Sequence, residues 1–313
     1  MISRAMFAWL LLGLIWGTNF VFIKWSTNAV SPMQVALVRV IAGFVTVAGY
    51  ALFTKQLKVA HLKFSIHFIV MACLAAAFYF YSFAEGTAIL ESGLAGAVSA
   101  SIPLFSLIAA VLFLSDEKLT INRGLGLLIG LLGVILIADP FASEAKGNLW
   151  AGVSWMVIGS FSLGISFVYA RKFVTPLSFP PAALTTYQLG FASLILLIVT
   201  DKSGLSVLQN DLSAFGILTI GLGVIGTGLA YVLYYYIVAN LGAVRASALT
   251  YVPPVVALFL GAVFLDEKIG FIDCLATVLI FAGVMFVNRN TKPKTTKPHF
   301  KLNKPHSSAE GPA

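Results

Sequence analysis

Long apolar runs fill almost the whole chain, and polar residues gather in the short stretches between them. Each run is close to the roughly 20 residues that a helix needs to cross the hydrocarbon core of a bilayer. The pattern therefore predicts ten membrane-spanning helices. Their expected ranges are 6–25, 33–53, 64–88, 93–114, 121–138, 148–170, 181–200, 213–239, 246–265 and 271–288.

These runs contain an internal repeat, and its offset is 150 residues. Pro103 followed by Asp116–Lys118 corresponds to Pro253 followed by Asp266–Lys268. Because each copy has an odd number of helices, the second copy enters the membrane from the opposite side, which is an arrangement typical of transporters. We expect an all-α integral membrane protein with ten transmembrane helices, built as two inverted five-helix repeats around a central cavity. The repeats would cover residues 1–142 and 143–290.

Composition supports a membrane protein and explains the charge. The chain is 59% hydrophobic and 10% charged, which excludes a water-soluble protein of this length. With the N-terminus inside, most Lys and Arg residues fall on the cytoplasmic side, so both termini are predicted to be cytoplasmic. The net charge of +8 then reflects topology and not nucleic-acid binding. The polar tail, residues 291–313, is expected to be a disordered cytoplasmic extension.

Several motifs along the first repeat resemble one family. They are Trp16-Gly17-Thr18-Asn19-Phe20 in the first run, Pro32 and Arg39 in the second, Pro103 in the fourth, and the acidic turn before the fifth. This layout resembles the EamA family of the drug/metabolite transporter superfamily, over roughly residues 5–290. The resemblance implies a ten-helix bacterial carrier of small organic molecules in the inner membrane, without naming a substrate.

Arg39 and Glu85 are ionisable residues inside predicted helices. Arg39 lies about 10 Å along the second helix, at 1.5 Å per residue, and a charge at that depth needs a partner. We expect Arg39 and Glu85 to approach each other. The alternative is that Arg39 snorkels or caps backbone carbonyls. Glu85 is also the candidate for proton coupling, because an apolar setting raises the pKa of a carboxyl group.

Aromatic and polar side chains near helix middles are the expected substrate contacts, since small-molecule sites combine apolar walls with a few polar groups. The aromatic candidates are Trp16, Tyr79, Tyr81, Trp155, Tyr187, Tyr231, Tyr234, Tyr235 and Tyr251, and the polar ones are Asn19, Arg39, Glu85, Ser99, Ser101, Gln188 and Thr250. The alternative is that the polar groups satisfy one another across packed helices.

The prolines, acidic turns and glycines are given structural roles. Pro103 and Pro253 are expected to kink their helices. Asp116 and Glu117 are expected to cap the start of the fifth helix, and Asp266 and Glu267 that of the tenth. The strings Gly13-x-x-x-Gly17 and Gly126-x-x-x-Gly130 predict close helix packing. Gly221–Gly226 matches a dinucleotide motif but lacks its strand–turn–helix context.

The leading interpretation is a secondary transporter of amino acids or related metabolites that works by alternating access, with export favoured. Its expected partners are the small-molecule substrate, the bilayer and, as candidate coupling ions, protons; the chain is expected to act as a monomer without a cofactor. A passive, channel-like facilitator remains open. An importer of nucleotide-type solutes would need more deep cations than Arg39. An intramembrane enzyme would need a catalytic motif that the sequence does not contain.

Overall fold

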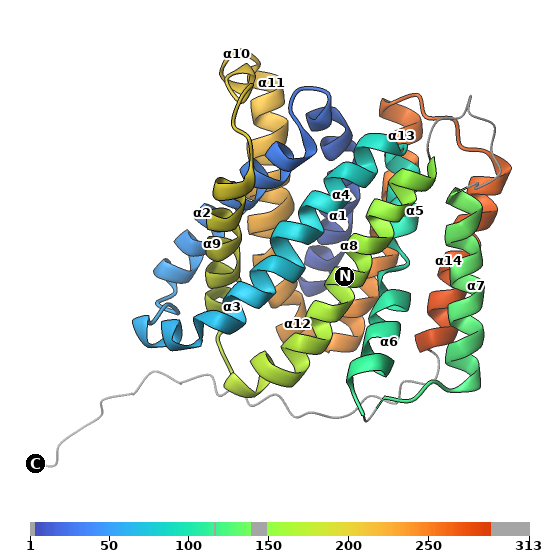
Figure 1. Ribbon diagram of the computed structural model, residues 1–313, viewed down its shortest axis with the longest axis horizontal. Coiled ribbons are helices and arrows are strands. Elements are labelled where there is room, and N and C mark those ends of the chain that lie inside the picture. The colour runs from blue at the N-terminus through green and yellow to red at the C-terminus, as the bar shows by residue number, and fades with distance from the viewer. Residues whose placement is uncertain (1–3, 116, 139–148, 289–313) are drawn as a thin grey trace, which may run out of the picture.

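The computed structural model describes residues 4–115, 117–138 and 149–288, and within these ranges the secondary structure is helical (Figure 1). The first half comprises α1 (Arg4–Thr27), α2 (Pro32–Phe53), η1 (Val59–Phe64), α3 (Ser65–Ala72), η2 (Cys73–Ala77), α4 (Phe78–Ile89), α5 (Ser92–Ser99), α6 (Ile102–Phe113) and α7 (Ile121–Ala138). The second half comprises α8 (Leu149–Tyr169), η4 (Ala170–Val174), η5 (Thr175–Leu177), α9 (Pro181–Val199), α10 (Val207–Asn210), α11 (Leu212–Phe215), η6 (Gly216–Leu229), α12 (Ala230–Ser247), η7 (Ala248–Tyr251), α13 (Val252–Phe264) and α14 (Phe271–Asn288).

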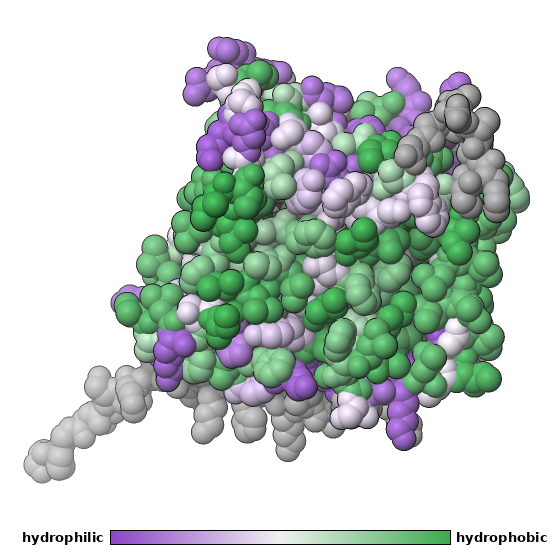
Figure 2. Space-filling view, in the orientation of Figure 1, coloured by the Kyte–Doolittle hydropathy of each residue, from purple (hydrophilic) through white to green (hydrophobic). Residues whose placement is uncertain are grey.

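The membrane-spanning pattern agrees with the ten predicted runs. In the described part of the chain, 8 helical segments are long and apolar enough to cross a bilayer, and the segments 252–264 and 271–287 are shorter apolar helices. Figure 2 shows hydrophobic residues around the middle of the molecule and hydrophilic residues at its two ends. Phe7, Leu128, Ile198 and Phe259 are among the large apolar side chains that the protein exposes. An exposed apolar belt of this kind is favourable in contact with lipid and unfavourable in contact with water. The chain is therefore an all-α, multi-pass membrane protein.

The third and eighth spans are interrupted at repeat-related places. A π-helical segment, η2, joins α3 to α4, and the longer π-helical η6 precedes α12. Residues 73–77 of η2 correspond to 223–227 within η6 at the repeat offset. A π segment widens the helix and re-aims the side chains that follow it, and such segments are common at functional sites.

The predicted proline kinks are helix breaks. α5 ends at Ser99 and α6 begins at Ile102, so Pro103 lies in the first turn of a new helix. Pro253 has the same place at the start of α13, after the 3₁₀ segment η7. A proline is well tolerated in a first turn, because the missing N–H would have no intrahelical partner there.

Glycines let pairs of helices pack closely, as the sequence predicts. A Cβ at Gly126 of α7 would lie 2.6 Å from the carbonyl oxygen of Gly283 in α14, and a Cβ at Gly133 would lie 2.6 Å from that of Ala276. Gly17 in α1 meets Val256 of α13 in the same way. These contacts join the last helices of the two repeats and fix α1 against α13.

The expected capping roles of Glu117 and Glu267 are wrong. Glu267 does not cap α14; it accepts hydrogen bonds from the start of α5, and Asp273 accepts from the backbone N–H of Gly270 at 2.8 Å. Glu117 pairs with Arg171 at 2.8 Å and with Arg123 at 3.0 Å, and its hydrogen bond with Arg171 is the main cause of its lowered pKa. Both glutamates reach groups that are distant in sequence and that only the folded chain brings near. Asp116 lies outside the described residues.

The α7–α14 contact gives a stability prediction. Gly126→Ala adds a methyl group where backbone atoms leave no room, so we expect a loss of about 1–3 kcal/mol. Gly124→Ala is the matched control on the same helix, because nothing lies within 4 Å of a Cβ there. Thermal unfolding in detergent should show a lower midpoint for Gly126→Ala and an unchanged or higher one for Gly124→Ala. Equal midpoints for the two variants would contradict this packing.

Candidate functional site

Arg39 is a buried cation in α2 that has few polar neighbours. Its side chain is 7% exposed, its Nε donates to the hydroxyl of Thr227 at 2.9 Å, and its guanidinium lies 4.2 Å from the centre of the Phe80 ring. A cation over an aromatic face gains about 0.5–2 kcal/mol. Among the described residues Thr227 is its only hydrogen-bond acceptor, which leaves the N–H groups of both terminal nitrogens available.

Small residues bring Thr227 to Arg39. A Cβ at Gly43 of α2 would lie 2.7 Å from the Thr227 methyl group, and Gly223 of η6 meets the Cβ of Ala42. α2 and η6 can therefore approach until a short threonine side chain reaches the guanidinium. Thr227 also donates its own proton to the carbonyl oxygen of Leu222 at 2.9 Å, so its oxygen is oriented to accept from Arg39.

Tyrosines extend the site from Arg39 towards α12. Tyr79 and Tyr231 lie near enough to interact electrostatically with the guanidinium. Tyr79 also packs on Phe83 with ring centroids 4.4 Å apart. Tyr231 stacks with Tyr235, one turn along α12, at a centroid distance of 6.2 Å. The hydroxyl of Tyr235 forms a short hydrogen bond with Thr185 of α9.

The aromatic row continues to α1. Tyr234 packs against Tyr235 at 6.0 Å and against Trp16 at 5.9 Å between ring centroids. Asn19, one turn from Trp16, donates its amide N–H to the carbonyl oxygen of Gly226 at 3.3 Å, while its buried Oδ1 has no partner among the described residues. We call this set the central cluster. Its members are Trp16, Asn19, Arg39, Tyr79, Phe80, Thr185, Thr227, Tyr231, Tyr234 and Tyr235.

The structure separates Glu85 from Arg39, so the expected pairing of these two described residues is wrong. Glu85 interacts with Tyr81, one turn earlier in α4. Tyr81 in turn packs on Trp155 of α8 with ring centroids 5.4 Å apart. Successive residues on a helix point about 100° apart, so Tyr81 and Glu85 follow a different face of α4 from Phe80. Tyr81, Glu85 and Trp155 therefore form a second group on the α4–α8 side.

Other predicted contacts have local structural partners. Tyr187 donates its hydroxyl to the carbonyl oxygen of Lys58 at 2.9 Å and stacks on Phe68. Ser101 and Ser99 each donate to the backbone of their own helical turn. Tyr251 packs on Phe281 with ring centroids 6.0 Å apart. Gln188 is buried in α9. The side chain of Thr250 lies outside the described residues. The hydroxyl groups of Ser99, Ser101 and Tyr187 therefore have backbone partners, and their contact with a substrate stays a prediction.

Sequence reasoning missed three members of the central cluster. Thr227 sits between glycines in an apolar run, and a lone polar residue in that setting is the signal that was available. Phe80 looks like an ordinary core residue, and its role as a cation platform needs the position of Arg39. Thr185 becomes visible only through its bond to Tyr235.

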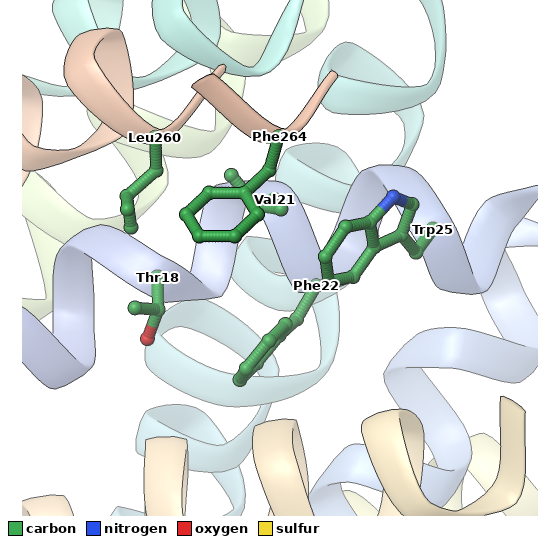
Figure 3. A pocket seen from close by; sticks show the side chains of 6 residues that line it. All are labelled: Thr18, Val21, Phe22, Trp25, Leu260 and Phe264. Carbon is green, nitrogen blue, oxygen red and sulfur yellow. The ribbon is translucent and has the colours of Figure 1, made fainter. Parts of the chain in front are cut away.

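A separate groove opens between α1 and α13. Its volume is about 280 Å³, and Figure 3 shows its wall of apolar side chains. The lining residues are Thr18, Val21, Phe22, Trp25, Leu260 and Phe264. Its lining includes no member of the central cluster and no charged group. Its one hydroxyl group, that of Thr18, donates to the carbonyl oxygen of Ile15 at 2.8 Å, so the groove offers a polar metabolite few orienting contacts and is a poor candidate for the functional site.

The described residues contain no cluster of three or more His, Cys, Asp or Glu side chains. Cys73 and Cys274 are exposed and unpaired by a disulfide. The chemistry available at the central cluster is therefore a buried guanidinium, tyrosine and threonine hydroxyls, and aromatic faces, a set suited to binding a small organic anion or zwitterion.

The Arg39–Thr227 contact can be tested without a known ligand. Thr227→Val keeps the shape and removes the acceptor, which leaves a buried charged donor unsatisfied at a cost of about 1–3 kcal/mol. We expect a lower thermal midpoint in detergent for Thr227→Val and a near-native one for Thr227→Ser. If both variants unfold at the native temperature, the hydrogen bond does not stabilise the fold.

Comparison with known proteins agrees with this architecture. The model of the EamA-like transporter family matches residues 3–138 and 150–289. The uncharacterized inner membrane transporter YedA of Escherichia coli K12 is 30% identical over 276 residues, which cover 87% of each chain. An uncharacterized transporter of Archaeoglobus fulgidus is 25% identical and covers 90% of this chain and 98% of its own.

A further bacterial relative and a solved structure extend the comparison. The uncharacterized transporter YdfC of Bacillus subtilis is 26% identical over 277 residues, or 88% of each chain. A crystal structure with 20% sequence identity has a TM-score of 0.60 and covers 92% of this chain and 98% of its own, which shows a shared fold. The two family matches coincide with the two halves that the repeat defines. The protein is a transporter, not an enzyme, and it belongs to the EamA-like transporter family.

Proposed function

We propose that the protein is a secondary transporter of amino acids or closely related metabolites, that it exports them across the bacterial inner membrane, and that it works by alternating access. The observation that carries the proposal is Arg39, a buried guanidinium without a carboxylate partner among the described residues. A charge at this depth costs at least a few kcal/mol unless something compensates it. A bound carboxylate supplies that compensation, because two parallel N–H donors match its two oxygens.

The surroundings of Arg39 favour an amino acid with an apolar or aromatic side chain. Tyr231 lies near the guanidinium, and its ring begins a row of aromatic faces that continues through Tyr235 and Tyr234 to Trp16. The unpartnered Oδ1 of Asn19 can accept a hydrogen bond, as an α-ammonium group requires. A nucleotide-type solute carries several negative charges, and Arg39 is the one cation in the central cluster, so that alternative has less support.

The repeat supports the transport mechanism. Residues 1–142 and 143–290 form the two inverted halves, and both termini lie in the cytoplasm by the distribution of Lys and Arg. In inverted-repeat carriers the halves rock about a site near the midplane. The chain carries both halves, so we propose that it acts as a monomer in the bilayer. The cytoplasmic tail proposed for residues 291–313 lies outside the described residues.

Transport in proteoliposomes tests the substrate class. We expect saturable uptake of a radiolabelled apolar or aromatic amino acid, reduced about 10- to 100-fold in Arg39→Gln, because a charge-assisted bond contributes about 1.5–3 kcal/mol. The matched control is Arg123→Gln, since Glu117 keeps Arg171 in that variant. The amide of the same amino acid has no carboxylate, so it should inhibit uptake of the labelled amino acid by the native protein only weakly. Native transport rates in Arg39→Gln would remove Arg39 from the site.

Proton coupling has its own test at Glu85, which interacts with Tyr81. If Glu85 carries the coupled proton, Glu85→Gln loses the stimulation of uptake by a pH gradient while it keeps counterflow exchange. Tyr81→Phe is the control, because it removes the partner and leaves the carboxyl group. Stimulation that persists in Glu85→Gln would assign coupling elsewhere. Equal uptake at all gradients in the native protein, without accumulation, would support the passive facilitator instead.

A further inference from the structure

Glu267 joins the two repeats at one end of the molecule. Its Oε1 accepts the backbone N–H of Ser92 at 2.6 Å, and its Oε2 accepts the backbone N–H of Gly93 at 2.9 Å and the hydroxyl of Ser92 at 3.0 Å. Ser92 and Gly93 begin α5 in the first repeat, whereas Glu267 follows α13 in the second. A carboxylate thus crosses between halves to satisfy N–H groups that have no intrahelical partner.

The residue that directly precedes α5 does not cap the helix itself. Glu91 occupies the N-cap position but makes no capping hydrogen bond through its side chain. The start of a helix favours negative charge, and Glu267 supplies it from the other repeat. Burial, and then the neighbouring charge of Glu267, raise the pKa of Glu91. The cap on α5 is therefore a contact between the two halves and not a local turn.

Glycines make this contact possible. A Cβ at Gly93 would lie 3.1 Å from the Cα of Leu258, and Gly96 meets the Cβ of Ala257, so α5 and α13 lie close together. A Cβ at Gly261 would collide with the Glu267 carboxylate itself. The carboxylate reaches α5 only because position 261 has no side chain.

The equivalent carboxylate at the opposite end makes a different contact. Glu117 corresponds to Glu267 at the repeat offset, but it pairs with Arg171 and Arg123. Val111 stands at the position equivalent to Gly261 and carries the side chain that Gly261 lacks, and at position 261 a Cβ would collide with the capping carboxylate. The two ends of the molecule therefore hold the same acidic residue in two different states, capping at one end and ion-paired at the other.

The cation needed for an ion pair is also present at the Glu267 end. Aligning Trp16–Val21 with residues 163–168 makes Lys24 the equivalent of Arg171. In this structure Lys24 donates to the carbonyl oxygens of Ala88 at 2.9 Å and Leu90 at 2.7 Å, at the end of α4. Lys24 and Glu267 thus hold the two sides of one turn, the turn between α4 and α5.

We propose that Glu267 is a latch for alternating access, so this inference rests on the proposed function. In the present state the hydrogen bonds of Glu267 and Lys24 hold the α4–α5 turn, and they keep α5 packed against α13. In the opposite state both release it, and Glu267 pairs with Lys24 as Glu117 pairs with Arg171 here. Capping bonds are exchanged for an ion pair, so no charge is left without a partner in either state.

The number of cationic partners at each end favours the latched state of Glu267. Asp273 stands at the position equivalent to Arg123, so a released Glu267 has one cationic partner where Glu117 has two. Glu91 and Asp273 add negative charge near both positions of Glu267: they repel the capped carboxylate, and Glu91 competes with a released Glu267 for Lys24. Gly261 also favours the latched state, because the absence of a side chain at this position leaves space for the capping carboxylate.

Thiol accessibility measures the latch without any substrate. In a background with Cys73→Ser and Cys274→Ser, Leu258→Cys places a thiol where α13 faces Gly93 of α5. The full chain in liposomes is treated with a water-soluble methanethiosulfonate reagent on both sides. We expect slow modification in this background and modification at least about tenfold faster with Glu267→Gln, which corresponds to about 1.4 kcal/mol removed from the latched state.

Two further variants make the test specific. Gly261→Val introduces the residue of the opposite end without changing a charge, and it should also accelerate modification. Glu117→Gln removes the same kind of carboxylate at the opposite end and should not. Size-exclusion profiles and thermal midpoints confirm that each variant is folded. Rates within about twofold of the background for both Glu267→Gln and Gly261→Val would overturn the latch, as would equal acceleration by Glu117→Gln.

The proposed pair of the released state has a direct readout. Carbodiimide coupling of a carboxylate to an amine needs direct contact, so a Lys24–Glu267 cross-linked peptide should increase in Gly261→Val relative to the native chain. No increase, despite faster thiol modification, would show that the latch opens without this pair and would overturn that part of the proposal. Neither readout requires an amino acid to be transported, so failure of the substrate assignment is distinguishable from failure of the latch.

Discussion

A polar group inside a bilayer has no water to satisfy it, and the main features of this protein follow from how its few buried polar groups are satisfied. Arg39 has the Phe80 ring and one threonine, which leaves donors for a ligand. The start of α5 has a carboxylate from the other half of the chain. In both places the partner comes from a distant element, so the same contacts that satisfy a polar group also set the arrangement of the helices.

Close helix packing is the second requirement, and glycine provides it where polar contacts must form. Gly43 and Gly223 let α2 and η6 approach until Thr227 reaches Arg39, and Gly261 makes room for the Glu267 carboxylate. Without these residues the hydrogen bonds could not form at their observed lengths. The glycine content of the helices lowers their intrinsic propensity, but in lipid the gain from close packing and hydrogen bonding offsets that cost.

The two repeats are equivalent in fold but not in chemistry. At the repeat offset Val111 corresponds to Gly261 and Arg123 to Asp273, and neither Gln188 nor Leu189, where the second repeat aligns with Arg39, carries a charge. A ligand that interacts with one half through a cation and with the other through hydroxyl and aromatic groups binds an asymmetric site. The ends of the molecule differ in the same way, since one glutamate caps a helix and the other pairs with arginines. Selectivity and the preferred state are thus expected to depend on the positions where the repeat is broken.

The amino-acid sequence is enough to assign the class of fold. Apolar runs of bilayer length predict the ten spans. The offset of 150, with an odd number of helices in each copy, predicts the inverted repeat. Both follow from the sequence, because the hydrophobicity of a run depends on its own residues and the number of helices comes from counting the runs. The sequence also identified Arg39 as a charge in need of a partner. The identity of that partner depends on how the helices pack, because Glu85 follows a different face of α4 and Thr227 lies 188 residues away. The role of Glu267 was decided in the same way: a carboxylate next to a helix start in sequence satisfies whichever unpaired N–H groups the packed helices bring within reach.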